Sequence, residues 1–212
     1  MFTFNAANTF CISLESNPER WTRMEKRLRA SGLEATKWHG VREFTDPFFS
    51  GLNQGQKGCA QSHLNIYKYI LKHNLDYALI LEDDACFNRR WKEILPIQIE
   101  PEWDLVLLNG SEPIVPRDTW VMVTEQYLTA GYIISQKGVR TLMNHFSSGY
   151  GAADWMTTRL QLYGHSYCYF PWVIIQEGKD TNIGSNLEAD HEKVLRCLGE
   201  IDYGLENYVN DS

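Results

Sequence analysis

Short apolar runs alternate with amphipathic stretches along this chain, which is the pattern of an α/β protein. The runs at residues 77–81 and 103–108 are apolar on both sides of the pleat, so they predict strands buried on both faces of a sheet. Other runs predict further strands at residues 9–14, 35–39, 120–123, 129–134, 167–169 and 173–175. The order of these elements favours a single, mostly parallel sheet.

Helix signals separate the strands. Asn17 and Pro18 are typical of a helix start, and Ser31 and Gly32 of its end. Ser135 predicts the cap of another helix. Helices are expected over residues 18–30, 58–73, 91–95, 136–144, 153–162 and 188–198. A long irregular loop is expected over residues 40–56, and loops of that length are often functional.

The composition is that of one ordinary globular domain. The 212 residues are 43% hydrophobic and 22% charged, with a net charge of −7. A single domain over residues 1–212 is predicted, with a core at about 9–186 and a C-terminal helix and tail at 187–212. The negative charge argues against a general nucleic-acid binder, because affinity for a polyanion needs clustered Lys and Arg.

Five cysteines are widely spaced, with no C-x-x-C pair and no His at zinc-ligand spacing. We expect buried free thiols, as in a reducing compartment. The chain shows neither a signal-peptide pattern nor the roughly 18 apolar residues of a membrane span. These features predict a cytoplasmic protein, one peripheral at a membrane, or an excised domain of a larger protein.

Three consecutive carboxylates, Glu82, Asp83 and Asp84, follow the apolar run at residues 77–81. They would lie at the carboxyl end of a buried strand, where open α/β sheets bind ligands. Adjacent acids repel one another, and a hard divalent cation such as Mn²⁺ or Mg²⁺ is a natural counter-charge that is usually shared with substrate phosphates. The alternative is a solvated acidic turn.

The order of motifs resembles glycosyltransferase family 25, which includes lipooligosaccharide galactosyltransferases and the catalytic domains of collagen galactosyltransferases. The matching segments are residues 12–14 with 18–20, 58–60 with 62–64, 79–84, 103–104 with 107–108, 130–135 with 137–138, and Asp154. The likeness covers roughly residues 9–186. It implies a single-domain GT-A fold and metal-dependent, inverting transfer of galactose or glucose from a UDP-sugar. The implied acceptor is a glycan, a lipid-linked glycan or a protein.

The resemblance also implies roles for particular residues. Glu82 and Asp84 would bind the metal, and Asp83 would reach the ribose or sugar of the donor. Further donor contacts are expected from Ser13, Leu14, Arg20 and His63.

Two of these donor residues have structural alternatives. Arg20 would otherwise brace the first strand-loop-helix turn, and His63 would be a packed neutral histidine.

Asp154 is the expected general base, because a carboxylate near helix-start amides at this sheet edge would accept the proton of an acceptor hydroxyl. Its alternative is a first-turn helix acid. Asp180 and Glu177 are the next candidates. Asp104 is expected to be structural, at the opposite edge. His165 and His191 have no partner in the sequence, although the resemblance implies that a late His or Asp often serves as an extra metal ligand. Trp38, Trp155 and Trp172 would stack on sugars or lie in the core.

Two other classes of function remain open. A metal-dependent nucleotidyltransferase also places acids at a strand end, but it normally carries a Gly- and Lys-rich loop near its first strand, unlike residues 13–16 here. A non-catalytic sugar-binding module on a degenerate transferase fold is the second alternative. The acceptor itself is not encoded in the composition of the loops.

Overall fold

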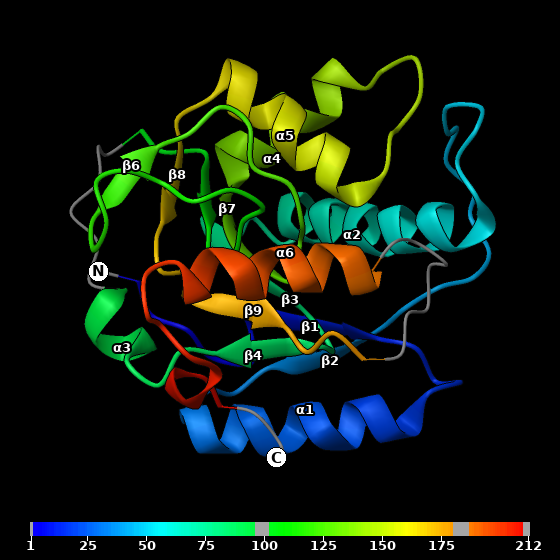
Figure 1. The fold of residues 1–212 in the computed structure, drawn as a ribbon. Coiled ribbons are helices and arrows are strands. Elements are labelled where there is room, and N and C mark those ends of the chain that lie inside the picture. The colour runs from blue at the N-terminus through cyan, green and yellow to red at the C-terminus, as the bar shows by residue number, and fades with distance from the viewer. Residues whose placement is uncertain (1, 96–101, 180–186, 210–212) are drawn as a thin grey trace.

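The computed structural model describes residues 2–95, 102–179 and 187–209. Within these residues the chain forms a seven-stranded sheet, a two-stranded sheet and helices on both faces of the larger sheet (Figure 1). The strands are β1 Thr9–Ser13, β2 Thr36–His39, β3 Tyr77–Glu82, β4 Ala85–Phe87, β5 Leu105–Leu107, β6 Trp120–Met122, β7 Gly131–Ser135, β8 Ser166–Tyr169 and β9 Ile174–Gln176. The helices are α1 Pro18–Ser31, α2 Gln54–Lys72, α3 Trp91–Ile94, α4 Gln136–His145, α5 Ala153–Tyr163, α6 Leu187–Gly199 and the short 3₁₀ helix η1 Leu205–Asn207.

The large sheet has the strand order β2-β1-β3-β7-β5-β8-β6. Strands β2, β1, β3, β5 and β8 run in one direction, while β7 and β6 run against their neighbours. The predicted α/β class, a mostly parallel central sheet flanked by helices, is therefore confirmed. The arrangement is consistent with a single-domain GT-A-like fold.

Two apolar layers hold the helices to the sheet. Because successive strand residues point to opposite faces, Ile80 packs with α2, α4 and α5, while Leu79 and Leu81 pack with α1 and α3. Figure 1 shows α1 on one side of the sheet and α2, α4 and α5 on the other. Burial on both faces explains why β3 is apolar up to its last residue, Glu82.

The predicted caps of α1 are confirmed. Asn17 Oδ1 accepts a hydrogen bond from Arg20 N, and Gly32 ends the helix with a φ of 58°. Ser135 also caps α4, as expected, by accepting a hydrogen bond from Gly138 N at 2.9 Å.

Helix α2 begins four residues earlier than predicted. Asn53 and Gln56 form a reciprocal capping box, in which each side chain accepts a hydrogen bond from the backbone N–H of the other residue. The predicted loop at residues 40–56 is therefore shorter, and its last residues already belong to the helix. The loop prediction was wrong for Gly55 and Gln56, which lie in the first turn of α2.

Strand β4 was not predicted from the sequence. It follows directly after the three acids and pairs antiparallel with β9, so that Ala85 lies opposite Gln176 and Phe87 opposite Ile174. Three residues are too few to show a period, and the preceding acids suggested a turn. The small β4–β9 sheet brings a distant part of the chain next to the acidic segment.

Candidate active site

A cavity of about 350 Å³ lies at the carboxyl ends of β1 and β3. It is lined by Ile12, Ser13, Leu14, Arg20, Gly40, Val41, Arg42, Gln54, Gly55, Gln56, Gly58, Cys59, Ser62, Glu82, Asp83, Asp84, Leu128, Thr129, Ala152, Ala153, Asp154, Gln176 and Asp190. The amino end of α2 therefore lies beside the acidic strand end. All of the predicted site residues except His63 line this cavity.

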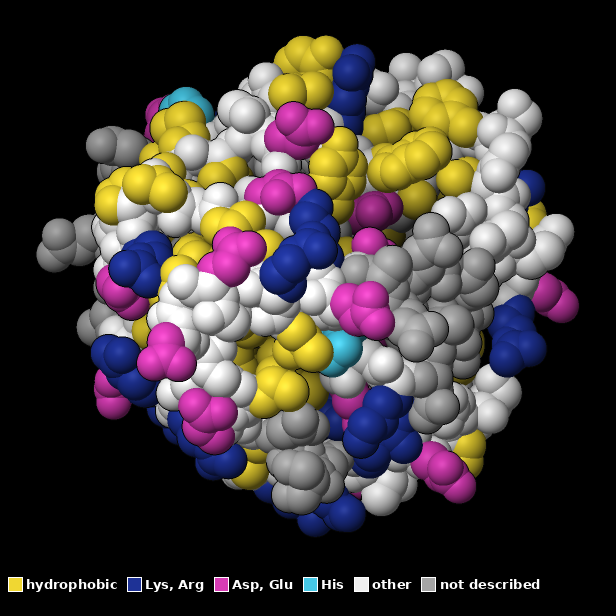
Figure 2. Space-filling model, in the orientation of Figure 1, with side chains coloured by type: hydrophobic (Ala, Val, Ile, Leu, Met, Phe, Trp, Pro, Cys, Tyr) yellow, Lys and Arg dark blue, Asp and Glu magenta, His cyan; other side chains and the backbone are white. Residues whose placement is uncertain are grey.

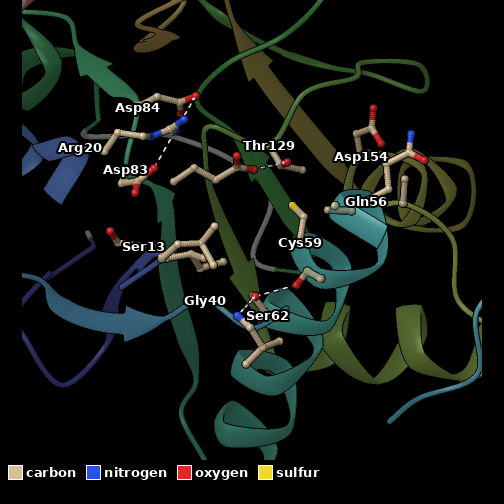
Figure 3. Close-up of a pocket in the computed structure, with 18 of the residues that line it drawn as sticks. Ser13, Arg20, Gly40, Gln56, Cys59, Ser62, Asp83, Asp84, Thr129 and Asp154 are labelled. Carbon is tan, nitrogen blue, oxygen red and sulfur yellow. Dashed lines mark hydrogen bonds and ion pairs between the residues drawn. The ribbon is translucent and has the colours of Figure 1, made fainter. Parts of the chain in front are cut away.

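Asp83 and Asp84 share one arginine on one wall of the cavity (Figure 3). Arg20 Nη2 lies 2.6 Å from Asp83 Oδ1 and 3.1 Å from Asp84 Oδ2, and all three side chains are buried. Burial raises the pKa of both carboxyls, and that of Asp84 reaches about 7 although Arg20 opposes the shift. Arg20 therefore neutralises part of the charge that two buried neighbouring carboxylates create.

Glu82 points to a different set of partners. Thr129 Oγ1 donates a hydrogen bond to its Oε1, and His63 Nε2 lies 3.5 Å from the same oxygen. Burial alone would raise the pKa of Glu82, but the interactions with His63 and Thr129 outweigh it, and the pKa is lowered. The three acids thus separate into an arginine-bound pair and a carboxylate held by His63 and Thr129.

His63 lies behind the cavity wall. It is fully buried, and its Nδ1 is 2.7 Å from the Tyr132 hydroxyl, which in turn is 2.6 Å from the Tyr67 hydroxyl. The predicted contact between His63 and the donor stays a prediction, because the side chain is not among those that line the cavity. In this structure His63 contacts Glu82 and belongs to a buried polar chain.

The segment opposite the acids is fixed to α2. Gly40 N donates to Ser13 O, and Ser62 Oγ accepts from Val41 N while donating to Gly58 O (Figure 3). A Cβ on Gly58 would lie 2.6 Å from the Val41 carbonyl oxygen, so a glycine is needed for this close approach. The glycine and serine of the predicted motif at residues 58–64 hold the cavity wall in place.

Asp154 lies in the first turn of α5, across the cavity from Asp83 and Asp84 in Figure 3. Its side chain is half-buried, and its Oδ1 accepts a hydrogen bond from Trp155 N at 2.9 Å. Burial raises the pKa of Asp154, and the charge of Glu82 adds to the shift. This position is compatible with a general base and with a structural acid at the helix start, because the carboxylate accepts a hydrogen bond from a helix-start amide and also faces the cavity.

Several cavity residues were not predicted. Cys59 and Gln56 come from α2, Thr129 from the segment before β7, Gln176 from the end of β9 and Asp190 from α6. Thr129 could have been found from its position at the start of the predicted strand at 129–134. No local pattern points to Asp190, because α6 reaches the cavity only through the tertiary fold.

The remaining candidates lie away from the cavity. Glu177 is buried between Arg23 and Arg27 of α1, at 3.0 and 2.8 Å, so it is held in ion pairs. Asp104 accepts from His165 N at the opposite edge, as predicted. His165 is exposed there, and His191 lies against Gly178. Asp180, the other alternative base, is outside the described residues.

The large tryptophans differ in exposure. Trp172 is fully buried and Trp38 packs against the core, whereas Trp155 is 52% exposed next to Asp154. Phe49 is 41% exposed. Figure 2 shows hydrophobic side chains gathered in the part of this face occupied by α5. The surface beside Asp154 is therefore partly apolar, which suits stacking against a sugar ring.

All five cysteines are free thiols, and all except Cys59 are buried. Burial raises the pKa of the Cys59 thiol well above its ordinary value, and Glu82 and Asp154 add to the shift. Among the described helices, none is long and apolar enough to cross a membrane.

Comparison with known proteins shows a similarity that includes this site. The sequence model described as glycosyltransferase family 25 (LPS biosynthesis protein) matches residues 42–112, which include α2 and the three acids. Procollagen galactosyltransferase 1-B of Xenopus laevis is 34% identical over 116 residues, 48% of this chain and 19% of the relative. Procollagen galactosyltransferase 1 of Danio rerio is 32% identical over 133 residues, 56% of this chain and 22% of the relative.

A more extended match is a glycosyltransferase 25 family member of Drosophila melanogaster, which is 29% identical over 165 residues, 63% of this chain and 27% of the relative. The matches thus span between 19% and 27% of the length of these relatives. The family match contains the acidic strand end and the helix that faces it across the cavity. Over these residues the chain is similar to glycosyltransferase family 25.

Proposed function

We propose that this chain is a metal-dependent glycosyltransferase. It moves a hexose, galactose or glucose, from a UDP-sugar to a hydroxyl group of a glycan or glycoprotein, with inversion at the anomeric carbon. Its family and the galactosyltransferase names of its relatives support this reaction class. The procollagen named in those relatives makes a protein-linked hydroxyl a reasonable first acceptor to test.

The observation that carries the proposal is a pair of unpartnered carboxylate oxygens at the cavity. Asp83 Oδ2 and Asp84 Oδ1 are buried and have no hydrogen-bond partner among the described residues. Arg20 supplies a single positive charge to two carboxylates, and Glu82 adds a third nearby. Such a donor set fits a hard divalent cation, which prefers carboxylate oxygens.

Asp84 and Glu82 would hold this cation, and the free oxygen of Asp83 would accept a hydrogen bond from a donor hydroxyl. When bound, Mn²⁺ or Mg²⁺ offsets the negative charge that develops on the departing diphosphate. Ser13 and Leu14 form the adjoining wall with Arg20, so the uridine end of the donor is expected along β1. Ser13 Oγ is buried at this wall and interacts with the Asp83 carboxyl, so it would lie next to the donor hydroxyl that Asp83 binds.

Asp154 is our proposed base. It faces the cavity opposite the arginine-bound acids, so an acceptor hydroxyl between it and the sugar would be placed for attack from the side away from the leaving group (Figure 3). Burial raises its pKa, which makes the carboxylate a stronger base than an exposed aspartate. The half-exposed Trp155 beside it offers an apolar face to the acceptor.

Calorimetry of UDP binding tests the donor site. UDP is expected to bind in the presence of Mn²⁺ and to lose most of its affinity in excess chelator, because a net-negative protein otherwise repels a diphosphate. Uridine, which lacks phosphates, is the matched control and should show no metal requirement. Unchanged UDP affinity without metal would remove the bridging role of Glu82 and Asp84.

A screen of common nucleotide sugars, with release of free nucleotide as the readout, tests the reaction. Selective turnover of a UDP-hexose would support the transferase, and pyrophosphate release from a nucleoside triphosphate would favour a nucleotidyltransferase instead. Binding of UDP without turnover of any donor, with or without glycan acceptors, would favour a non-catalytic module.

A further inference from the structure

Three side chains with different ligand atoms meet at the edge of the cavity. Cys59 and His63 lie four residues apart on α2, so they share one face of the helix, and Glu82 reaches them from the end of β3. The Cys59 sulfur, a His63 ring nitrogen and a Glu82 carboxylate oxygen all lie within 4.8 Å of one another. Thiol, imidazole and carboxylate together form a set that the Asp83 and Asp84 pair does not provide.

The His63 ring is prepared for a ligand on one side. Its Nε2 is fully buried and faces Glu82 Oε1 at 3.5 Å, a distance longer than that of a good hydrogen bond. Its Nδ1 contacts the Tyr132 hydroxyl, which contacts Tyr67. A histidine that binds a metal through Nε2 commonly donates its Nδ1–H to such an outer partner, which fixes the ring orientation.

We propose that Cys59, His63 and Glu82 form a binding site for Zn²⁺ or a metal of similar softness. Zinc combines sulfur, nitrogen and oxygen ligands in tetrahedral sites, with bonds of roughly 2.0–2.3 Å. Ligand atoms in such a site lie about 3.3–3.8 Å apart, and the 3.5 Å between His63 Nε2 and Glu82 Oε1 falls in this range. Binding releases the Cys59 thiol proton to solvent, and the thiolate becomes the third protein ligand.

The fourth position would open towards the cavity, because Cys59 and Glu82 both line it. Water, or an oxygen of a bound substrate, would complete the coordination there. Mg²⁺ and Mn²⁺ prefer oxygen ligands, so the thiol gives this site a different selectivity from that of the carboxylate pair.

Glu82 is common to this site and to the proposed Mn²⁺ site. Zn²⁺ held by Cys59 and His63 would therefore withdraw Glu82 from the donor cation, and zinc would inhibit transfer. This inhibition rests on the proposed function, whereas metal binding at Cys59 does not.

Cobalt absorption tests the site without any enzymatic assay. Co²⁺ is added as a zinc surrogate without other divalent ions, because a cation at the shared Glu82 would compete with it; the charge-transfer band reports only a site that contains a thiolate. The wild-type chain is expected to develop a thiolate-to-cobalt charge-transfer band at one equivalent, and Zn²⁺ should remove the band by displacing Co²⁺. Loss of the band is expected in Cys59→Ser, and retention in Cys197→Ser, whose thiol does not line the cavity.

The remaining variants separate the ligands. His63→Gln should weaken Co²⁺ binding by at least the roughly 10–100-fold that loss of an outer-shell partner costs. Thermal melting of each variant establishes that it is folded. No charge-transfer band in the wild type, or an equal band in Cys59→Ser, would overturn the proposal. It would leave Cys59 as a cavity-wall thiol and His63 as a structural partner of Glu82.

Inhibition by zinc is measured at a fixed Mn²⁺ concentration. For each protein, the transfer rate with Zn²⁺ is divided by the rate of the same protein without Zn²⁺. Zinc should slow the wild type more than Cys59→Ser. Equal inhibition of both, with the cobalt band present, would keep the binding site but place inhibition elsewhere. If the chain shows no transfer activity at all, the cobalt measurement still decides the metal site.

Discussion

Arg20 Nη2 lies 2.6 Å from Asp83 Oδ1, and both side chains are almost fully buried. The same nitrogen is 3.1 Å from Asp84, so one guanidinium serves two carboxylates. A buried charge needs a compensating charge or hydrogen bond. Arg20 compensates the two aspartates only in part, because each aspartate keeps one unpaired carboxylate oxygen. The cavity can therefore accept a further positive charge, and it should tolerate the loss of one negative charge.

Asp84→Asn should abolish metal-dependent turnover without lowering the stability of the metal-free protein. Burial raises the pKa of Asp84 to about 7, well above its unfolded value, so the folded state carries a costly charge at higher pH. The neutral amide has the same shape and removes that cost. At pH 8 without metal, the melting temperature is expected to be equal to or higher than that of the wild type, while turnover falls by orders of magnitude.

Asp104→Asn is the matched control, because Asp104 is equally buried but lies at the opposite edge and binds His165 N and Lys137. It should lower the melting temperature and leave turnover per folded molecule near normal. A large fall in the melting temperature of Asp84→Asn, instead, would mark the cavity acids as structural.

Asp154→Asn should leave UDP and metal affinity almost unchanged, because the residue lies across the cavity from the cation ligands. Transfer should fall by about 10²–10⁴, the usual contribution of a positioned base. Loss of a helix-start contact alone would cost about 1 kcal/mol of stability and spare the rate. Rate, UDP affinity and melting temperature of one variant distinguish the two roles. Near-normal transfer would move the search to Asp190, which lines the same cavity.

The pH dependence of transfer provides a second test of Asp154. Its pKa is raised by burial, and only the deprotonated carboxylate accepts a proton. The wild-type rate should therefore fall on acidification at a pH above the ordinary aspartate range. The slow residual rate of Asp154→Asn should lack this acidic limb. An identical limb in both proteins would assign it to another group.

Trp155→Ala should weaken acceptor use and spare the donor. Trp155 is half-exposed beside Asp154, and an indole face stacked on a sugar contributes roughly 0.5–1.5 kcal/mol. The KM for the acceptor is expected to rise about 3–10-fold with kcat and UDP affinity little changed. Leu162→Ala, at an equally exposed position near the other end of α5, is the control. Equal effects of the two substitutions would argue against stacking.

Arg27→Met should destabilise the fold. Arg27 Nη2 lies 2.8 Å from Glu177 Oε1 and both side chains are fully buried, so removing one partner leaves a buried charge. Such losses cost about 3–5 kcal/mol, and the remaining contact of Glu177 with Arg23 favours the lower end. Chemical denaturation measures the change. The exposed pair Arg90 and Glu93 is the control, and Arg90→Met should melt like the wild type.

Much of the fold was predictable because its signals are local. Helix caps and buried strands are recognised from adjacent residues in the sequence. The caps Asn17 and Ser135 and the β3 strand, which is apolar on both faces, were predicted in this way and confirmed. Strand β4 was missed because its pairing partner, β9, is about 90 residues away. Antiparallel β7 between β3 and β5 likewise depends on long-range pairing and not on the residues themselves.

The site was predictable to the extent that it follows a strand end. The acids line the cavity at the carboxyl end of β3, where a ligand site was expected. The partners of these acids were not predictable, because the contacts of Arg20 with Asp83 and of Thr129 with Glu82 join residues 63 and 47 positions apart. Asp190 lines the cavity because of where the tertiary fold places α6, and no local sequence pattern predicts that placement.

Helix α1 turns three arginines, Arg20, Arg23 and Arg27, towards Asp83, Asp84 and Glu177. Their spacing of three and four residues places them on one helical face. Substitution of any one arginine would leave a buried acid with fewer partners, so these positions and their acids should change together in evolution. Homologues that lose Glu177, for example, are expected to have replaced Arg27 by an apolar residue, while Arg20 should persist wherever Asp83 and Asp84 do.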